Sequence, residues 1–238
     1  MLSTPSTSHV SFDTIYEPAE DSYLLLDTLS SSTEASWLQE RFSPTTSSPL
    51  LVEVGTGSGV VIAFLAAHAK TIFGREDVLA LGVDVNANAC GSTTETVSRA
   101  VTEQGSASSY LGSVCSDLTF SILEASIDVL VFNPPYVPTP ELPAGPGYVR
   151  SGFEADSHLL SLSYAGGIDG METTYRLLRA LPTVLSQRGV AYILLCTQNK
   201  PEEAKHFVNS VLSMQVETVN TSGKKAGWEK LQIIRIWR

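Results

Sequence analysis

The stretch LLVEVGTGSGVVIAFLAA, residues 50–67, decides the fold that we predict for this chain. It opens with five residues that are apolar except for Glu53, the pattern of a buried strand, and it continues into an apolar segment typical of a helix. Between the two lie Gly55, Gly57 and Gly59. A glycine turn of this kind brings the backbone close to a ligand at the carboxyl end of a sheet. The dinucleotide-binding pattern G-x-G-x-x-G would need glycine where Val60 stands, so the spacing favours a different ligand.

Strand-like and helix-like segments alternate along the rest of the chain. The predicted strands are 50–54, 78–83, 109–114, 127–132 and 189–196, and the predicted helices are 58–69, 86–103, 170–181 and 201–212. This alternation predicts an α/β fold made of crossover units, with a mostly parallel sheet and helices on both faces. Residues 214–220 and 229–237 have no helix between them and predict an antiparallel hairpin at one edge. Residues 137–169 receive no predicted element, and a loop of that length beside a site is typical of a substrate-binding or disordered segment.

The residues before the first predicted strand form an N-terminal extension, 1–49, ahead of a main domain, 50–238. Residues 1–12 are rich in serine, threonine and proline, which predicts a frayed terminus. The segment EPAEDSYLLLDTL, residues 17–29, starts with proline and acidic residues and continues with apolar ones, the pattern of a helix N-terminus. A short amphipathic piece around Trp37 follows, and the polar stretch SPTTSSP links it to the main domain.

The composition favours an intracellular protein that does not bind nucleic acid unaided. The 238 residues carry a formal charge of −10, which opposes binding to a phosphate backbone without a local basic patch or a partner. The three cysteines are widely spaced and form no C-x-x-C pair, so we predict neither a disulfide framework nor a metal site in this chain. There is no pattern of a signal peptide and no apolar run of about 18 residues. We therefore expect a cytoplasmic protein that also enters the nucleus.

Three carboxylates at successive strand ends point to the ligand. Glu53 stands one residue before the first strand ends, where it can accept a hydrogen bond from a cationic amine. Asp84 follows the second strand and can accept from both hydroxyls of a ribose, while Asp117 follows the third and can accept from the exocyclic amine of adenine. Either aspartate has an alternative role as the cap of a helix at 86 or at 118. Together the series fits S-adenosylmethionine, which carries an amine, a ribose and an adenine and needs no phosphate cradle.

A second decisive stretch, VLVFNPPYVPTP at residues 129–140, ends a strand with an amide, two prolines and an aromatic ring. Ligands of open α/β sheets lie outside the carboxyl ends of the strands, which places Asn133 at the reaction centre. Methyl transfer to nitrogen depends mainly on positioning the acceptor. We predict that the side-chain carbonyl of Asn133 and the main-chain carbonyl of Pro134 each accept one N–H of a planar NH₂ group, and that Tyr136 lies flat against it.

The segments YEPAEDSYLLLD, FNPPYVPTP and YAGGIDG occur in this order along the chain. Together they resemble the HemK-like glutamine methyltransferases, and in particular the eukaryotic branch that modifies the class I translation release factor. The likeness extends from Tyr16 onward. It implies the class I methyltransferase fold, a Rossmann-like seven-stranded sheet, with the N-terminal helix closing as a lid over S-adenosylmethionine.

The resemblance also implies roles for individual residues. In methylation of the glutamine side chain of a Gly-Gly-Gln loop, the amide would be held by Asn133, Pro134, Pro135 and Tyr136. The cofactor would be bound by Tyr16, Asp21, Ser22, Glu53, Gly55, Gly57, Gly59, Asp84, Asp117, Leu118 and Asn133. Ser22 stands where this branch usually has threonine, which keeps the hydroxyl, and Tyr164 stands where it usually has tryptophan.

A partner is implied as well: a small zinc-binding activator subunit that covers an apolar surface of the cofactor domain and keeps the methyltransferase soluble as a heterodimer. Other acceptors stay open on the residues alone. An adenine amine of nucleic acid presents the same planar NH₂ to the clamp, and a protein lysine is a further acceptor. From a different class, a non-catalytic partner-binding module would keep the same fold.

Overall fold

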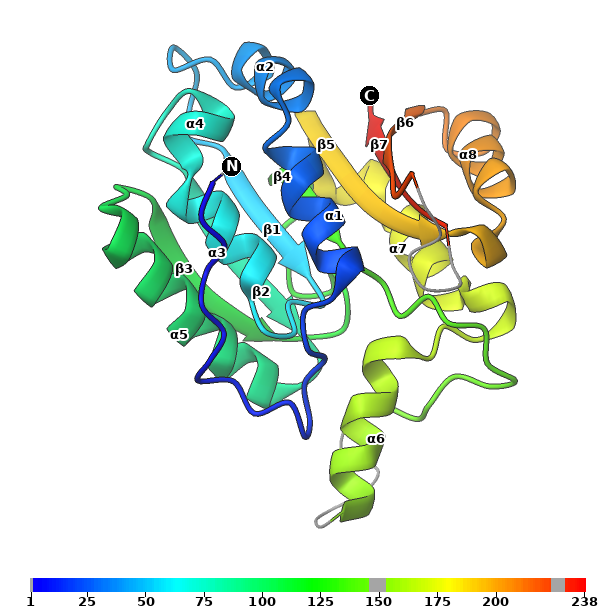
Figure 1. Cartoon of the computed structure of the whole chain (residues 1–238). Coiled ribbons are helices and arrows are strands. Elements are labelled where there is room, and N and C mark those ends of the chain that lie inside the picture. The colour runs from blue at the N-terminus through cyan, green and yellow to red at the C-terminus, as the bar shows by residue number, and fades with distance from the viewer. Residues whose placement is uncertain (1, 146–152, 224–229) are drawn as a thin grey trace.

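A computed structural model describes residues 2–145, 153–223 and 230–238. The described residues form a seven-stranded sheet of order β3-β2-β1-β4-β5-β7-β6 (Figure 1). Its strands are β1 (Leu50–Val54), β2 (Leu79–Asp84), β3 (Ser109–Cys115), β4 (Ile127–Phe132), β5 (Leu185–Cys196), β6 (Gln215–Thr221) and β7 (Leu231–Trp237). Strands β1 to β5 pair in parallel, and β7 runs antiparallel to both β5 and β6. The predicted α/β fold with an antiparallel C-terminal hairpin is confirmed.

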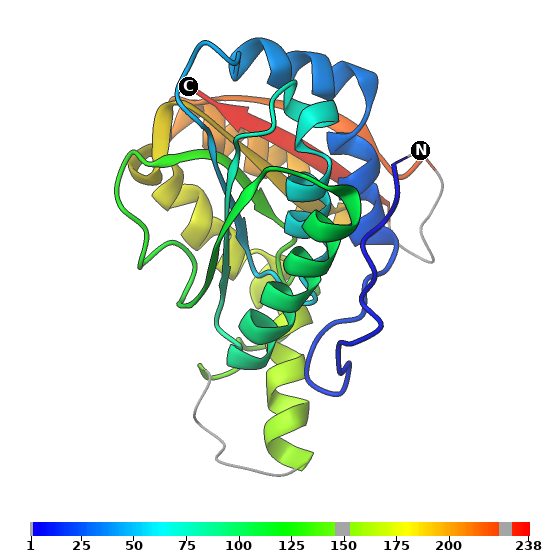
Figure 2. The ribbon, with the colours of Figure 1, turned by 90° about the vertical axis from the view of Figure 1, so that its left-hand side faces the viewer.

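Helices cover both faces of the sheet, as Figures 1 and 2 show. The described helices are α1 (Glu20–Leu29), α2 (Ser32–Arg41), α3 (Val60–Ala67), α4 (Ala69–Phe73), α5 (Ala87–Gln104), α6 (Phe153–Tyr164), α7 (Glu172–Val184) and α8 (Pro201–Ser210), with short 3-10 turns η1 (Ile168–Gly170) and η2 (Thr197–Asn199). Helices α1 to α5 share one apolar core with strand residues such as Leu51. Helices α7 and α8 share the other with residues such as Val52. Successive residues of β1 thus serve opposite cores, as expected of a strand buried on both faces.

The strand order reverses between β1 and β4. From β1 the chain proceeds outward through β2 and β3, and it then returns to place β4 on the other side of β1. Val54 and Phe132 are paired at the carboxyl ends of these two strands. The glycine loop and Asn133, which follow them, therefore start side by side. Open α/β sheets bind ligands in the crevice at such a point.

The N-terminal extension shares the core of the main domain. Leu29 of α1 and Phe42 after α2 are fully buried against the sheet. Beneath α2, Arg235 of β7 donates to both carboxylate oxygens of Glu34 at 3.0 and 2.8 Å, and the Tyr192 hydroxyl donates to the same carboxylate at 2.8 Å. A buried ion pair whose partners are also hydrogen-bonded resists separation. The base of the predicted lid is therefore anchored to the sheet.

The composition of residues 1–12 predicts a frayed terminus, but the N-terminal strap, residues 2–16, is held against the domain. The His68 ring nitrogen Nε2 donates to the Ser3 carbonyl at 2.8 Å, the His9 ring hydrogen-bonds with Thr96 at 3.1 Å, and Val10 is buried. Figure 1 shows the strap running along α3 and α5. The prediction was wrong because a few anchoring side chains, rather than average polarity, decide whether a terminal segment is held.

Several boundaries differ from the expectation. Strand β5 begins at Leu185 and not at 189, and α7 spans Glu172–Val184 in place of 170–181. The single helix predicted over 58–69 is divided at His68 into α3 and α4. Part of the unassigned stretch forms α6, which projects beside the carboxyl ends of the strands (Figure 1). Across the ranges that the structure describes, no helix is both long and apolar enough to cross a bilayer.

Candidate active site

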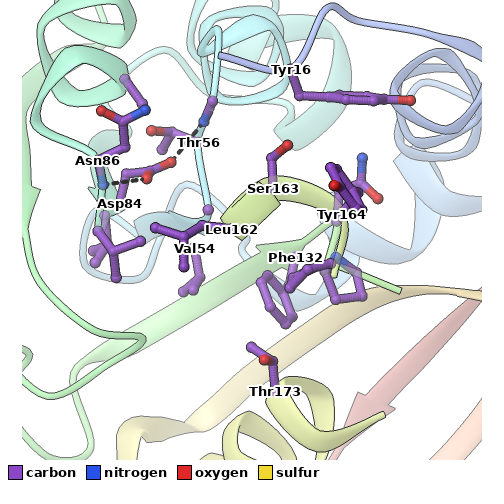
Figure 3. Close-up of a pocket in the computed structure, with 18 of the residues that line it drawn as sticks. Tyr16, Val54, Thr56, Asp84, Asn86, Phe132, Leu162, Ser163, Tyr164 and Thr173 are labelled. Atoms are coloured by element: carbon purple, nitrogen blue, oxygen red, sulfur yellow. Dashed lines mark hydrogen bonds between the residues drawn. The ribbon is translucent and has the colours of Figure 1, made fainter. Parts of the chain in front are cut away.

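A cavity of about 640 Å³ lies at the carboxyl ends of β1 and β4 (Figure 3). Its walls come from the glycine loop, the ends of β2 and β3, the Asn-Pro-Pro-Tyr segment, the N-terminal strap, the first turn of α1 and α6. All residues predicted for cofactor binding or catalysis line it except Gly59. Its size is within the usual range for small-molecule and cofactor sites.

The glycine loop depends on left-handed backbone at three positions. The φ angles are 67° at Gly55, 51° at Gly57 and 77° at Gly59. The Gly57 N–H donates to Asp84 Oδ2 at 2.9 Å, which ties the loop to the end of β2. Gly59 lies outside the cavity, and a Cβ there would lie only 2.7 Å from the Thr93 Cα. Because Gly59 has no side chain, α3 can pack closely against α5. Gly59 therefore serves this packing and does not contact a ligand directly.

Glu53 is a buried carboxylate at the cavity wall. It is 3% exposed and accepts a hydrogen bond from the Ile62 N–H at 2.9 Å. Burial raises the pKa of Glu53 well above its ordinary value, a shift that the Ile62 hydrogen bond opposes and the nearby Asp84 charge increases. Among the described residues, no basic side chain forms an ion pair with it. A cation delivered by a ligand would compensate the buried charge.

Asp84 joins the glycine loop to the start of α5. Its Oδ2 accepts from the Gly57 N–H, and its Oδ1 accepts from the Asn86 N–H at 2.8 Å (Figure 3). Burial raises the pKa of Asp84, and these hydrogen bonds oppose the rise. The cap of α5 is Asn86, whose side chain accepts from Asn88, so capping is not what places Asp84 here. Each carboxylate oxygen keeps acceptor capacity toward the cavity.

Asp117 was expected to accept a hydrogen bond from the adenine amine, but in the structure its carboxylate already has a partner. Its carboxylate is paired with Arg176 of α7, and both side chains are about half exposed. No helix begins at 118: the described residues 117–122 form turns, and Leu118 has φ of 48°. The capping alternative for Asp117 is therefore wrong. Arg176 also lines the cavity and would compete with an adenine amine for this carboxylate.

The two polar atoms of the Asn133 side chain have different surroundings. Its Nδ2 donates to Asp21 Oδ2 at 3.0 Å, and the Tyr136 hydroxyl donates to the same oxygen at 3.4 Å. The Asn133 Oδ1 is buried and has no hydrogen-bond partner among the described residues. A buried acceptor is costly to leave without a partner, so this oxygen is available to a ligand donor.

Asp21 and Ser22, in the first turn of α1, line the cavity. Tyr16 lines it as well (Figure 3). The second carboxylate oxygen of Asp21 accepts from the Ser22 N–H at 2.6 Å. The described contacts of Asp21 are thus with the clamp and with its own helix. The structure thus places Asp21 at the cavity wall, with its Oδ2 accepting from the Asn133 Nδ2.

Several residues of the site have no signal in the sequence. Arg176 comes from α7, and the apolar wall of α6 includes Leu159 and Leu162. The Asn86 Nδ2 donates to the Thr14 carbonyl at 2.8 Å, which holds the strap against the cavity. A patterned motif would not reveal any of them, because each contributes one isolated side chain from a distant element.

Comparison with known proteins identifies the family. No protein-family model matches the chain. The eRF1 methyltransferase catalytic subunit mtq2 of Schizosaccharomyces pombe is 33% identical over 245 residues, spanning 100% of this chain and 96% of that protein. The chain belongs to the Mtq2/HEMK2 family of methyltransferases. Human Methyltransferase HEMK2 is 31% identical over 98% of this chain and 96% of its own length.

Solved structures agree with the family fold. The E. cuniculi Mtq2-Trm112 complex, described as responsible for methylating the eRF1 termination factor, matches with a TM-score of 0.58 at 24% identity. That match covers 94% of this chain and 99% of the other. The N-terminal domain of human METTL16 in complex with SAH matches with a TM-score of 0.54 at 13% identity. Both likenesses confirm the methyltransferase fold of this family member.

Proposed function

We propose that this chain transfers a methyl group from S-adenosylmethionine to the side-chain nitrogen of the glutamine in the Gly-Gly-Gln loop of the eukaryotic class I release factor. The observation that carries the proposal is the buried Oδ1 of Asn133, which has no hydrogen-bond partner in the described part of the chain, while the Nδ2 of the same amide donates to Asp21 at the cavity. The family supports the substrate class, because the Schizosaccharomyces pombe relative is an eRF1 methyltransferase.

The residues at the cavity fit this cofactor. Glu53 would meet the ammonium group, since it is a buried carboxylate that pairs with no basic side chain of the described ranges. Asp84 would accept from the ribose hydroxyls, and Tyr16, Ser22 and Leu118 would complete the walls. When bound, S-adenosylmethionine supplies an electrophilic methyl group.

The protein's contribution to the reaction is to position an amide. An amide nitrogen is a weak nucleophile because its lone pair is delocalised into the carbonyl group. The Asn133 Oδ1 and the Pro134 carbonyl would each accept one N–H of the substrate NH₂, which fixes its plane and draws electron density toward nitrogen. Pro135 stiffens the turn, and Tyr136 packs against the planar group. Neutral acceptors suit a neutral amide better than a lysine ammonium group.

We further propose a heterodimer with a small zinc-binding activator subunit. The E. cuniculi relative forms a complex with Trm112, which supports a partner of that kind. Three large apolar side chains on β3 and the turn after it are exposed here, at 55% for Leu111, 91% for Phe120 and 78% for Leu123. Strand β3 is also an edge of the sheet, where unpaired backbone groups are available. A translation factor as substrate would place the heterodimer in the cytoplasm.

The test is methyl transfer from labelled S-adenosylmethionine by the heterodimer. The acceptors are the release factor and its variant in which the loop glutamine is replaced by alanine. Label on the first and not on the second is the expected result, and Asn133→Ala should remove most of it while cofactor still binds. Equal labelling of both acceptors, or labelling only of RNA or histone lysine, would overturn the glutamine assignment.

A further inference from the structure

Asn199, in η2 after β5, has both polar atoms of its side-chain amide in hydrogen bonds within the protein. It is 1% exposed. Its Nδ2 donates to the Tyr136 carbonyl and to the Asp169 carbonyl, each at 2.9 Å, and its Oδ1 accepts from the Cys196 N–H at 2.8 Å. One buried side chain thus joins the end of β5 to two loops. It does not line the cavity.

The two loops that Asn199 joins are the Asn-Pro-Pro-Tyr segment and the glycine segment 165–170. They approach so closely that a Cβ on Gly170 would lie 1.9 Å from the Tyr136 carbonyl oxygen, and one on Gly166 would lie 2.3 Å from that of Pro135. The Val137 N–H also donates to the Tyr164 carbonyl at 2.9 Å. The backbone that carries the clamp is therefore fixed from its C-terminal side by this contact.

We propose that Asn199 is a positioning residue for methyl transfer, acting through the backbone of Tyr136 on the Pro134 carbonyl and the Tyr136 ring. The inference rests on the proposed function, in which these two groups hold the substrate amide. Asp21 holds the side chain of Asn133, and Asn199 holds the main chain that follows it. A misplacement of about 1 Å at a reacting centre can cost about 100-fold in rate.

Position 199 requires both an acceptor and a donor on one short side chain, which makes asparagine hard to replace. Aspartate has the same shape and keeps the acceptor for Cys196, but it offers no donor to the two carbonyls. It would instead bring a carboxylate against the oxygens of Tyr136 and Asp169 in a buried place, which is unfavourable. The Lys200 to Asp169 ion pair at 2.7 Å lies next to this contact but is about half exposed at both side chains, so it holds the loop more weakly.

The experiment compares Asn199→Asp with Asn220→Asp in the heterodimer. Asn220 of β6 is a matched control, because its Nδ2 also donates a hydrogen bond, to Thr28 Oγ1 at 2.9 Å, and its Oδ1 also accepts from a backbone N–H, that of Thr221 at 2.8 Å. The rate is expressed per mole of bound cofactor, which removes any loss from misfolded protein. We expect Asn199→Asp to lower kcat by about 10- to 100-fold, with the Kd for S-adenosylmethionine changed less than about 3-fold.

A second measurement does not need the substrate. Hydrogen exchange of the N–H groups of Val137, Gly166 and Gly170, in the cofactor-bound protein, should be faster in Asn199→Asp and unchanged in Asn220→Asp. Unchanged exchange, or a normal kcat per bound cofactor, would overturn the positioning role. If the wild-type heterodimer leaves the glutamine unlabelled while exchange responds as expected, the proposed substrate is wrong and the positioning of the loop by Asn199 stands.

Discussion

The amide of Asn133 can present either its oxygen or its nitrogen to the cavity, and the two faces have opposite hydrogen-bonding character. Asp21 decides between them, because its Oδ2 accepts from the Asn133 Nδ2 and from the Tyr136 hydroxyl. A carboxylate has no donor to offer, so the Oδ1 of Asn133 is left for the ligand. One side chain of α1 thereby selects the orientation of the clamp.

Asp21→Asn should lower kcat by about 10-fold or more, because the new NH₂ group permits the flipped orientation of Asn133. Turnover and cofactor Kd of the heterodimer would be measured separately. Asp27→Asn is the control, since Asp27 is exposed on the same helix. A variant with normal kcat would show that Asp21 does not orient the amide.

We expect Glu53 to lower the stability of the cofactor-free protein and to strengthen cofactor binding. Its raised pKa means that the folded state binds a proton more tightly than the unfolded chain, so the stability of the cofactor-free protein falls as pH rises through the range above the ordinary carboxyl pKa. Glu53→Gln should remove this loss and raise the Tm at neutral pH, by about 2–4 °C for each 1 kcal/mol gained. The same change should weaken cofactor binding by about 10-fold or more, because the ammonium group loses its counter-charge.

Thermal unfolding between pH 5 and 8, without cofactor, checks the first part, and calorimetry with S-adenosylmethionine checks the second. The exposed Glu40, changed to glutamine, serves as the reference. Equal Tm differences at all pH values would contradict the linkage.

At the scale of elements, the packing of α3 on α5 sets the position of the glycine loop. Gly59→Ala should cost several kcal/mol, because it combines a left-handed φ with a Cβ 2.7 Å from the Thr93 Cα. Gly105→Ala, at the C-terminus of α5, has φ of 60° but open space around it, and should cost only about 1–2 kcal/mol. Denaturant unfolding separates the two costs. Similar losses in both variants would show that backbone strain, and not the helix contact, requires Gly59.

At the scale of the whole molecule, the exposed apolar side chains of β3 and the following turn should govern assembly. Replacing Leu111, Phe120 and Leu123 by serine should reduce co-purification with the activator subunit and increase the solubility of the chain alone. The 64% exposed Val211, on the far end of α8, is the control for removing an apolar group. Heterodimer affinity unchanged by the triple substitution would place the partner elsewhere.

Much of the fold is predictable from the sequence alone because its signals are local. The strands β1 and β4 are found at their predicted bounds, since a short, mostly apolar run that stops near glycine or proline marks a buried strand. The candidate site is also partly predictable, because parallel strands bring their carboxyl ends to one edge. Glu53, Asp84 and Asn133 gather there for that reason.

Tertiary structure alone decided what holds those residues. Asp21 meets Asn133 across 112 residues of chain, Arg176 meets Asp117 across 59, and Asn199 meets Tyr136 across 63. The N-terminal strap is likewise held by a few separate contacts and not by a periodic pattern. Periodicity and turn residues report the conformation of neighbours in sequence, whereas a contact between distant side chains depends on how whole elements pack. The sequence by itself therefore determined the sheet and the chemistry at its edge, and the packing of distant elements determined the orientation of the catalytic amide.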